Sequence, residues 1–258
     1  MRRLTLTTVI ALMFSLSLSA QTVDEIIAKN ITAKGGMAKM KAVQSVRITG
    51  DVETGEMQAG FTQVYKRPMK MRLDISVQGL TLTQAYDGQN GWQIVPFTGK
   101  TDAEPLVADD LKNTQEQADF DGPLVDYKQK GNTVELVGKE KIDGGADAYH
   151  LKVTLKNSGV RNLYLDARTF LAIKTVAKIT TRGTEVELET MIGDYKEVEG
   201  LMFPFSIEQQ PAGGQGAKQK ITFKKVELNT RVDDSFFKMP AVAPPPAPEK
   251  TGPAPVPK

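Results

Sequence analysis

A two-residue alternation of apolar and polar side chains recurs through most of the chain after Gln44, and it limits the fold more than any other feature. It appears in "VRITGDV", "GFTQVY" and "MRLDISV", and again in "TVELVGKEKI" and "TEVELETMI". In a β-strand this spacing sends apolar side chains to one face and polar side chains to the other. Turn-forming stretches such as "YDGQNGW" separate the segments. We therefore expect about ten or eleven antiparallel strands.

Two stretches interrupt the alternation and indicate helices. Residues 22–43 open with "TVDE", a capping-box pattern, and continue with isoleucines at helical spacing until Gly35 and Gly36. Residues 101–127 lack β-branched alternation, and short helices fit them best. A long run of strands with helices before and within it predicts a mainly β, α+β fold. We expect a single strongly curved antiparallel sheet, an unclosed β-barrel, with helices covering its concave face.

The two ends of the chain differ in composition from the part between them. Arg2 and Arg3 precede an apolar run at residues 9–18 and the small residues Ser19 and Ala20, a pattern typical of a cleaved signal peptide. An uncleaved anchor helix is the alternative, but spanning a bilayer takes roughly 20 apolar residues. We divide the chain into a signal peptide at 1–20, a folded domain at 21–240 and a proline-rich, disordered tail at 241–258.

Charge and composition exclude several classes of function. The chain has 33 basic and 31 acidic residues, and removal of Arg2 and Arg3 with the signal peptide leaves 31 of each. This balance does not suggest a nucleic acid or an anionic membrane as partner. The absence of cysteine excludes disulfides, thiolate metal sites and a lipid-modified N-terminal cysteine. The only histidine, His150, is expected to face solvent. We expect no catalytic residues, no metal site and no cofactor, and therefore no enzyme.

Arg67 breaks the alternation within "TQVYKRPMKMRLDIS" by falling on the apolar side. An arginine on an apolar wall is costly unless it is paired or hydrogen-bonded. One interpretation places it at a cavity rim beside Pro68, where it bonds the carbonyl ends of the covering helices and latches them. In the other, Pro68 ends the strand, the alternation resets and Arg67 is an exposed turn residue.

The apolar side chains of the alternation are candidates for the lining of a lipid-binding cavity. Each of them could equally belong to ordinary core packing between sheet and helices, and the alternation alone does not separate the two. The candidates are Val46, Ile48, Phe61, Tyr65, Met71, Leu73, Ile75, Leu82, Trp92, Ile94, Leu151, Ile173, Leu188, Phe203 and Phe223.

The order of motifs resembles that of a known family. An exported chain opens with an amphipathic helix and continues with "GFTQVYKRPMKMRLD", "AYDGQNGWQIVPF", "NLYLDARTFLAIKTV", "GDYKEVEGLMFPFSIE" and "VDDSFFKMPAV". This order is similar to that of the LolA/LolB-like outer-membrane lipoprotein carriers, in particular the periplasmic LolA-type members, over most of residues 22–240. The resemblance implies an unclosed barrel with a helical lid and an apolar cavity for lipoprotein acyl chains. It also implies that Arg67, in the Lys-Arg-Pro motif, makes polar bonds that hold the lid and govern cargo release.

The resemblance further implies a role and a location. It suggests a periplasmic, monomeric carrier that binds lipoprotein acyl chains or other lipids and moves them towards the outer membrane in lipoprotein sorting. An inner-membrane donor complex and an outer-membrane acceptor are the implied partners. The alternative is a lipid-sensing regulatory module of the same fold, resembling the RseB-type proteins, that acts on a membrane partner.

Overall fold

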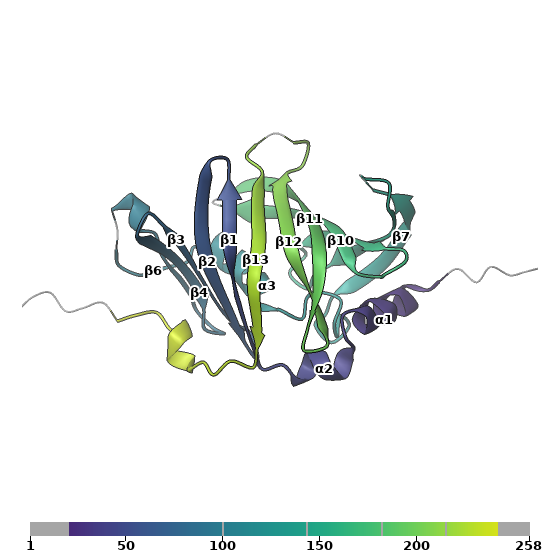
Figure 1. The fold of residues 1–258 in the computed structure, drawn as a ribbon, viewed down its shortest axis with the longest axis horizontal. Helices are drawn as coiled ribbons and strands as arrows, with labels where there is room; N and C mark the ends of the chain where they lie inside the picture. The colour runs from purple at the N-terminus through teal and green to yellow at the C-terminus, as the bar shows by residue number, and fades with distance from the viewer. Residues whose placement is uncertain (1–20, 100, 143, 182, 215, 242–258) are drawn as a thin grey trace, which may run out of the picture.

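The structure is a computed structural model that describes residues 21–241 except residues 100, 143, 182 and 215 (Figure 1). The predicted signal peptide at 1–20, and the predicted tail beyond residue 241, lie outside the described residues. Among the residues described, none of the helices has the length and apolarity needed to cross a membrane.

Thirteen strands form one sheet in the order β6-β5-β4-β3-β2-β1-β13-β12-β11-β10-β9-β8-β7. Neighbouring strands pair antiparallel, and β6 and β7 are the two edges, so the sheet curves without closing into a barrel (Figure 1). The predicted fold class is confirmed. The strands are β1 (Ser45–Thr54), β2 (Met57–Lys66), β3 (Lys70–Val77), β4 (Leu80–Tyr86), β5 (Gly91–Ile94), β6 (Glu104–Pro105), β7 (Thr133–Lys141), β8 (Asp147–Thr154), β9 (Val160–Asp166), β10 (Ala172–Thr181), β11 (Thr184–Val198), β12 (Leu201–Pro211) and β13 (Gln219–Leu228).

The strand number exceeds the expected ten or eleven for a physical reason. Each alternating segment forms a separate strand, because a turn or loop breaks the chain between neighbouring segments. The two-residue β6 adds a further strand within the stretch expected to be helical, where Pro105 lies opposite Trp92 at the edge of β5.

The helices are α1 (Val23–Ala33), α2 (Met37–Ala42) and α3 (Ala108–Ala118), with short 3-10 turns η1 (Pro96–Thr98) and η2 (Asp234–Phe237). The predicted capping box is present: the Thr22 amide donates to Glu25 Oε2 at 2.9 Å, and the Glu25 amide donates to Thr22 Oγ1 at 3.3 Å. Gly35, at φ +115°, turns the chain between α1 and α2, and a Cβ there would lie 2.3 Å from the carbonyl oxygen of Gly200. In 101–127, α3 is the helix, and turns follow it.

Helices α1 and α2 pack on the concave face of the sheet. Ile26 and Ile27 of α1 are buried in a cluster with Leu151 and Leu165 of β8 and β9. Met40 of α2 is buried in a second cluster built around β1, β2, β12 and β13. Figure 1 shows both helices at the end of the sheet opposite the β1–β2 and β12–β13 hairpins. This end of the molecule is therefore closed by an apolar core.

The C-terminal segment packs on the opposite, outer face of β3 to β5. Phe237 in η2 is fully buried, and its carbonyl oxygen accepts a hydrogen bond of 2.8 Å from Trp92 Nε1. The guanidinium of Arg72 lies 4.5 Å from the ring centroid of Phe236 and 5.6 Å from that of Trp92. These contacts fix η2 to the outer face of the sheet.

Candidate functional site

A cavity of about 1000 Å³ lies between α3, the turns after it and the concave face of the sheet. Its volume is at the upper end of the roughly 300–1,000 Å³ common for small-molecule sites. Apolar side chains from the strands form part of its wall, among them Leu163, Ile179 and Leu188. Side chains of α3 and of the β8–β9 turn add amide and charged groups, so the cavity is amphipathic rather than purely apolar.

Helix α3, which we call the lid, is tied to β4 and β10 by neutral hydrogen bonds. Asn113 Nδ2 donates to the carbonyl oxygen of Thr180 at 2.9 Å. Gln84 Nε2 donates to the hydroxyl of Thr114 at 2.9 Å, and that hydroxyl donates to the carbonyl oxygen of Asp110 at 2.7 Å. Both contacts connect a helix side chain to a strand across the cavity edge.

An ion pair joins the lid to the far side of the cavity. Glu116 of α3 pairs with the guanidinium of Arg161 on β9, and it also accepts a 2.8 Å hydrogen bond from Asn157 Nδ2. Both members of the ion pair keep less than a fifth of their side-chain surface exposed. Arg161 lies opposite Val153 and Ala177, so it points from the apolar side of its strand.

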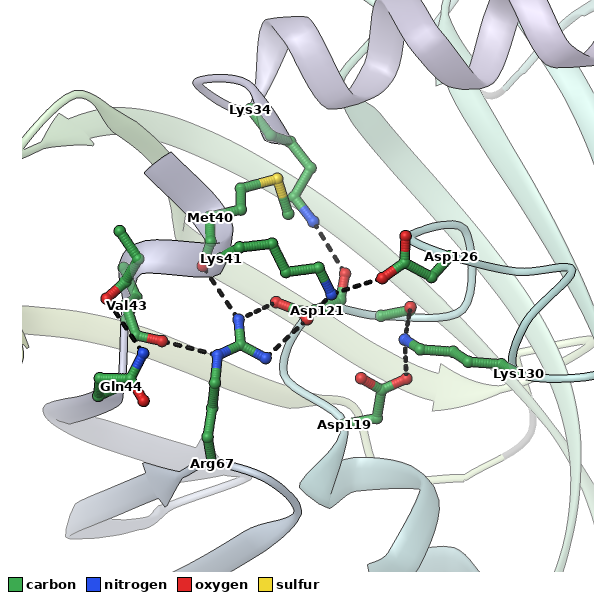
Figure 2. A network of polar contacts seen from close by, with 12 residues as sticks. Lys34, Met40, Lys41, Val43, Gln44, Arg67, Asp119, Asp121, Asp126 and Lys130 are labelled. Carbon is green, nitrogen blue, oxygen red and sulfur yellow. Dashed lines mark hydrogen bonds and ion pairs between the residues drawn. The ribbon is translucent and has the colours of Figure 1, made fainter. Parts of the chain in front are cut away.

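Arg67 connects α2 to the loop that follows the lid (Figure 2). Its Nε donates to the carbonyl oxygen of Val43 at 2.7 Å, and Nη2 donates to that of Met40 at 3.0 Å. The same guanidinium forms a bidentate pair with Asp121, with Nη1 to Oδ2 at 2.8 Å and Nη2 to Oδ1 at 2.7 Å. Arg67 does lie in the turn between β2 and β3, but only 22% of its side chain is exposed.

Asp121 is the acidic centre of this contact. Its side chain is only 4% exposed and also accepts a 2.9 Å ion pair from Lys41 Nζ. Burial acts to raise the pKa of Asp121, but the hydrogen bonds and charges of Arg67 and Lys41 outweigh it and lower the pKa to about 2. Asp121 is therefore ionised over the whole physiological range.

The loop after the lid has a second anchor beside the first. Lys130 Nζ pairs with Asp119 and donates to the carbonyl oxygen of Gly122 at 2.8 Å (Figure 2). Lys34, at the end of α1, donates to the carbonyl oxygen of Asp121 at 3.4 Å. Burial lowers the pKa of Lys34, and the charge of Asp121 opposes this shift. The loop is thus held by charged groups from α1, from α2 and from its own far end.

The candidate lining residues separate into several groups in the structure. Leu188 lines the large cavity, while Val46 and Phe203 line a smaller one of about 150 Å³ beside Phe120. Leu82 pairs with Ile75 on the concave face, and Ile173 lies partly exposed in β10, but neither belongs to the large cavity's lining. The rest of the concave-face candidates pack in the core: Ile48, Phe61, Tyr65, Met71, Leu73, Ile75, Leu151 and Phe223.

Two candidates lie on the other face of the sheet. Trp92 is opposite Ala85 and Ile94 is opposite Thr83, whereas the cavity-lining Gln84 projects to the concave face. The β4–β5 turn, in which Asp87 Oδ1 accepts from the amides of two following residues, sets this register. Trp92 and Ile94 are therefore not lining residues, because the apolar side chains of β5 point to the outer face of the sheet, where η2 packs.

Sequence reasoning missed the polar part of the site. It named neither Asp121 nor the lid residues Asn113 and Glu116, because polar residues in a predicted helix look like a solvated surface. Arg161 could have been found, since "VRNLYLD" places it on the same parity as Leu163 and Leu165. That is the signal that drew attention to Arg67.

Comparison with known sequences finds no matching family model and no significant match among curated proteins. Solved structures do match. A LolA superfamily protein from Nitrosomonas europaea aligns with a TM-score of 0.58 and 15% identity, over 85% of this chain and 98% of that one. A DUF1329 family protein from Desulfovibrio piger aligns at 0.55 and 12%, over 84% and 97%.

A third structure is a putative outer membrane lipoprotein-sorting protein domain from Vibrio parahaemolyticus. It aligns with a TM-score of 0.54 and 10% identity, over 83% of this chain and 94% of that one. At these identities the likeness concerns the fold. The chain therefore has a LolA-like fold: one open, curved sheet with helices on its concave face.

Proposed function

We propose that this protein is a periplasmic carrier that holds the acyl chains of lipoproteins or other lipids beneath the lid and moves them towards the outer membrane. The observation that supports this most is the cavity of about 1000 Å³ left between α3 and the sheet after the other helices have packed. The LolA-like fold agrees with it. No chemical step is involved, because the task is to shield acyl chains from water.

The energetics of a carrier require binding that is favourable and also reversible. Burying an acyl chain stabilises it by ~0.8 kcal/mol per methylene, so a long chain leaves water readily. Release then requires the lid to move at small cost. Each neutral hydrogen bond between α3 and the sheet contributes a net of about 0.5–1.5 kcal/mol, because water replaces it when the lid opens. A lid held by polar contacts and one small apolar cluster suits this cycle.

Arg67 acts in this proposal as the latch of the lid. It binds two carbonyl groups at the end of α2 and the carboxylate of Asp121 just after α3. One side chain thus connects the packed helical cover to the lid. Opening the lid at this end separates Asp121 from its cationic partners, so the strength of the contact sets the balance between closed and open forms.

Binding can be tested with a fluorescent fatty-acyl probe and a variant that fills the cavity. Ala177→Phe places a ring in the cavity wall, whereas Val176→Phe, one residue away, places it on the outer face. Excluding two methylenes of the probe, at ~0.8 kcal/mol each, should lower the affinity of Ala177→Phe about tenfold. Val176→Phe should bind like the wild type. Equal affinities for the three proteins would show that the probe does not use this cavity.

The latch is tested by the rates of probe binding and release. Arg67→Leu removes the charged contacts and leaves a side chain suited to an apolar wall. A charged hydrogen bond contributes about 1.5–3 kcal/mol, so the open–closed balance should shift more than tenfold and release should accelerate. Arg47→Leu, on β1, is the control and should leave both rates unchanged. Unaltered rates in Arg67→Leu would remove the latch from the proposal.

The location of the protein and the identity of its cargo have to be tested with protein taken from the native cell. Fractionation should find the protein in the periplasm with an N-terminus near Gln21, and native mass spectrometry of that material should reveal a bound lipid or acylated peptide. A carrier should then pass the bound probe to acceptor vesicles. Retention of the probe together with binding to a membrane protein would instead favour a lipid-sensing module. An intact N-terminus in the membrane fraction would contradict periplasmic release.

A further inference from the structure

Three polar side chains form a row across the floor of the cavity. Gln209 of β12 lies opposite Thr190 of β11, and Thr190 lies opposite Thr175 of β10. All three side chains line the cavity. They come from neighbouring strands at one level of the sheet, so the row runs across the strands rather than along one of them.

Apolar residues border this row on both sides. On the side of the β10–β11 hairpin, Pro211 and Ala177 both lie opposite Leu188. On the other side, Ile207 lies opposite Ile192. On this face of β11 and β12 the polar row is therefore flanked by apolar side chains, of which Leu188 lines the cavity.

The groups in the row lack protein partners. Thr190 is only 8% exposed, and its hydroxyl opens onto the cavity together with the side chains of Thr175 and Gln209, with no side-chain hydrogen bond to the described residues. Water in the cavity can bond these groups, so a ligand that displaces this water must offer hydrogen bonds of its own or leave the row unpaired at a cost.

The three side chains of the row are uncharged, which favours a ligand with a neutral hydrogen-bonding group. Four charged side chains at the cavity edge pair with one another, Arg161 with Glu116 and Lys130 with Asp119. Two hydroxyls and one carboxamide offer neutral donors to a carbonyl oxygen. Apolar rows on either side of a line of neutral donors match a molecule in which a carbonyl linkage separates apolar parts.

We propose that Gln209, Thr190 and Thr175 recognise the ester or amide linkage of an acyl lipid and set its position in the cavity. This inference rests on the proposed function and adds its specificity. The threonine hydroxyls and the Gln209 Nε2 group donate to the linkage carbonyl, while the acyl chain runs over the apolar rows. The cavity should therefore prefer an acyl ester to an ether of the same length, which keeps the chain but loses the carbonyl.

The test is a competition between two lipids that differ only in this linkage. Dioctanoylglycerol and its dioctyl ether analogue each displace the fluorescent fatty-acyl probe from the wild-type protein. One retained hydrogen bond should let the diester displace the probe at about fivefold lower concentration. The double variant Thr190→Val/Gln209→Leu, of similar shape, should bring the ratio close to one. Thr222→Val, on the outer face of β13, is the matched control and should keep the wild-type ratio.

The possible failures are distinguishable. If the wild type binds the probe but the diester and the diether compete equally, the inference is wrong while the proposed function stands. The inference is equally overturned if the double variant keeps the wild-type ratio. If the wild type does not bind the probe at all, the proposed function fails together with it. The wild-type ratio needs no variant, so the test does not depend on the double variant folding.

Discussion

Two helical covers lie on the same concave face, and they differ in the size of the apolar side chains that attach them. The first, α1 with α2, is attached by apolar packing, with Ile26, Ile27 and Met40 buried against the strands. The second, the α3 lid, buries only Ala118 in a smaller apolar cluster and adds hydrogen bonds and ion pairs such as Glu116 with Arg161. The large cavity lies under the second cover.

The difference teaches which cover is suited to move. Lifting α1 would expose apolar side chains to water at ~25 cal/mol per Å². Lifting α3 would expose the smaller side chain of Ala118 and would exchange polar contacts for contacts with water, which offset much of their loss. Arg67 binds both covers, through carbonyl oxygens of the first and the Asp121 carboxylate beside the second. In the proposed function, α3 is the cover that moves, α1 with α2 is the cover that stays, and Arg67 couples the two.

The largest effect on the free energy of unfolding should come from truncating a core side chain under α1. Ile26 is fully buried, so Ile26→Ala leaves a cavity and should lower the free energy of unfolding by about 2–4 kcal/mol in urea titrations. Val107→Ala, at an exposed residue before the lid, is the control and should change it little. A loss below about 1 kcal/mol for Ile26→Ala would show that apolar packing does not fix α1.

Asp121→Asn should have a smaller effect that depends on pH. Because the folded-state pKa is about 2, below the usual 3.8, ionised Asp121 stabilises the folded state above about pH 4, and this contribution disappears as the pH falls towards 2. The variant should have a free energy of unfolding about 2 kcal/mol lower than the wild type at pH 6. The gap should narrow between pH 4 and pH 2. A gap that stays constant across this range would contradict the ionic contact.

The smallest effect on stability should come from the lid itself. Asn113→Ala removes the hydrogen bond to the Thr180 carbonyl and should lower the free energy of unfolding by about 0.5–1.5 kcal/mol. Release of the fluorescent acyl probe should nevertheless become faster, because the lid loses one of its attachments. The exposed neighbour Lys112→Ala serves as control. Unchanged release in Asn113→Ala would mean that the lid does not need to open there.

The sheet and the first cover could be predicted from the sequence because their signals are local. Alternation, turn residues and the Thr22–Glu25 capping box depend on neighbours in the chain, and each appears where it was expected. The face of β5 was not predictable in this way. Whether Trp92 points inwards depends on the register set by the β4–β5 turn and on Phe237, which lies 145 residues away in sequence.

The site was only partly predictable for a similar reason. Arg67 could be noticed because it is a charged residue on the apolar side of its strand. Its partner Asp121, however, lies 54 residues further along the chain in a turn-rich stretch. The space between α3 and the sheet depends on how the helix sits, and periodicity carries no information about this. Most candidate lining residues consequently pack in the core rather than around the large cavity.

Hydrogen–deuterium exchange, read by mass spectrometry on peptides from α1 and α3, tests the distinction between the fixed and the detachable cover most directly. In the wild type, the amides of Ala108–Ala118 should exchange faster than those of Val23–Ala33, because α3 buries smaller apolar side chains than α1 and so opens locally at lower cost. Arg67→Leu should accelerate exchange in α3 about tenfold and leave α1 unchanged. Equal exchange in the two helices, or acceleration of both together in Arg67→Leu, would contradict a lid that moves independently of the packed cover.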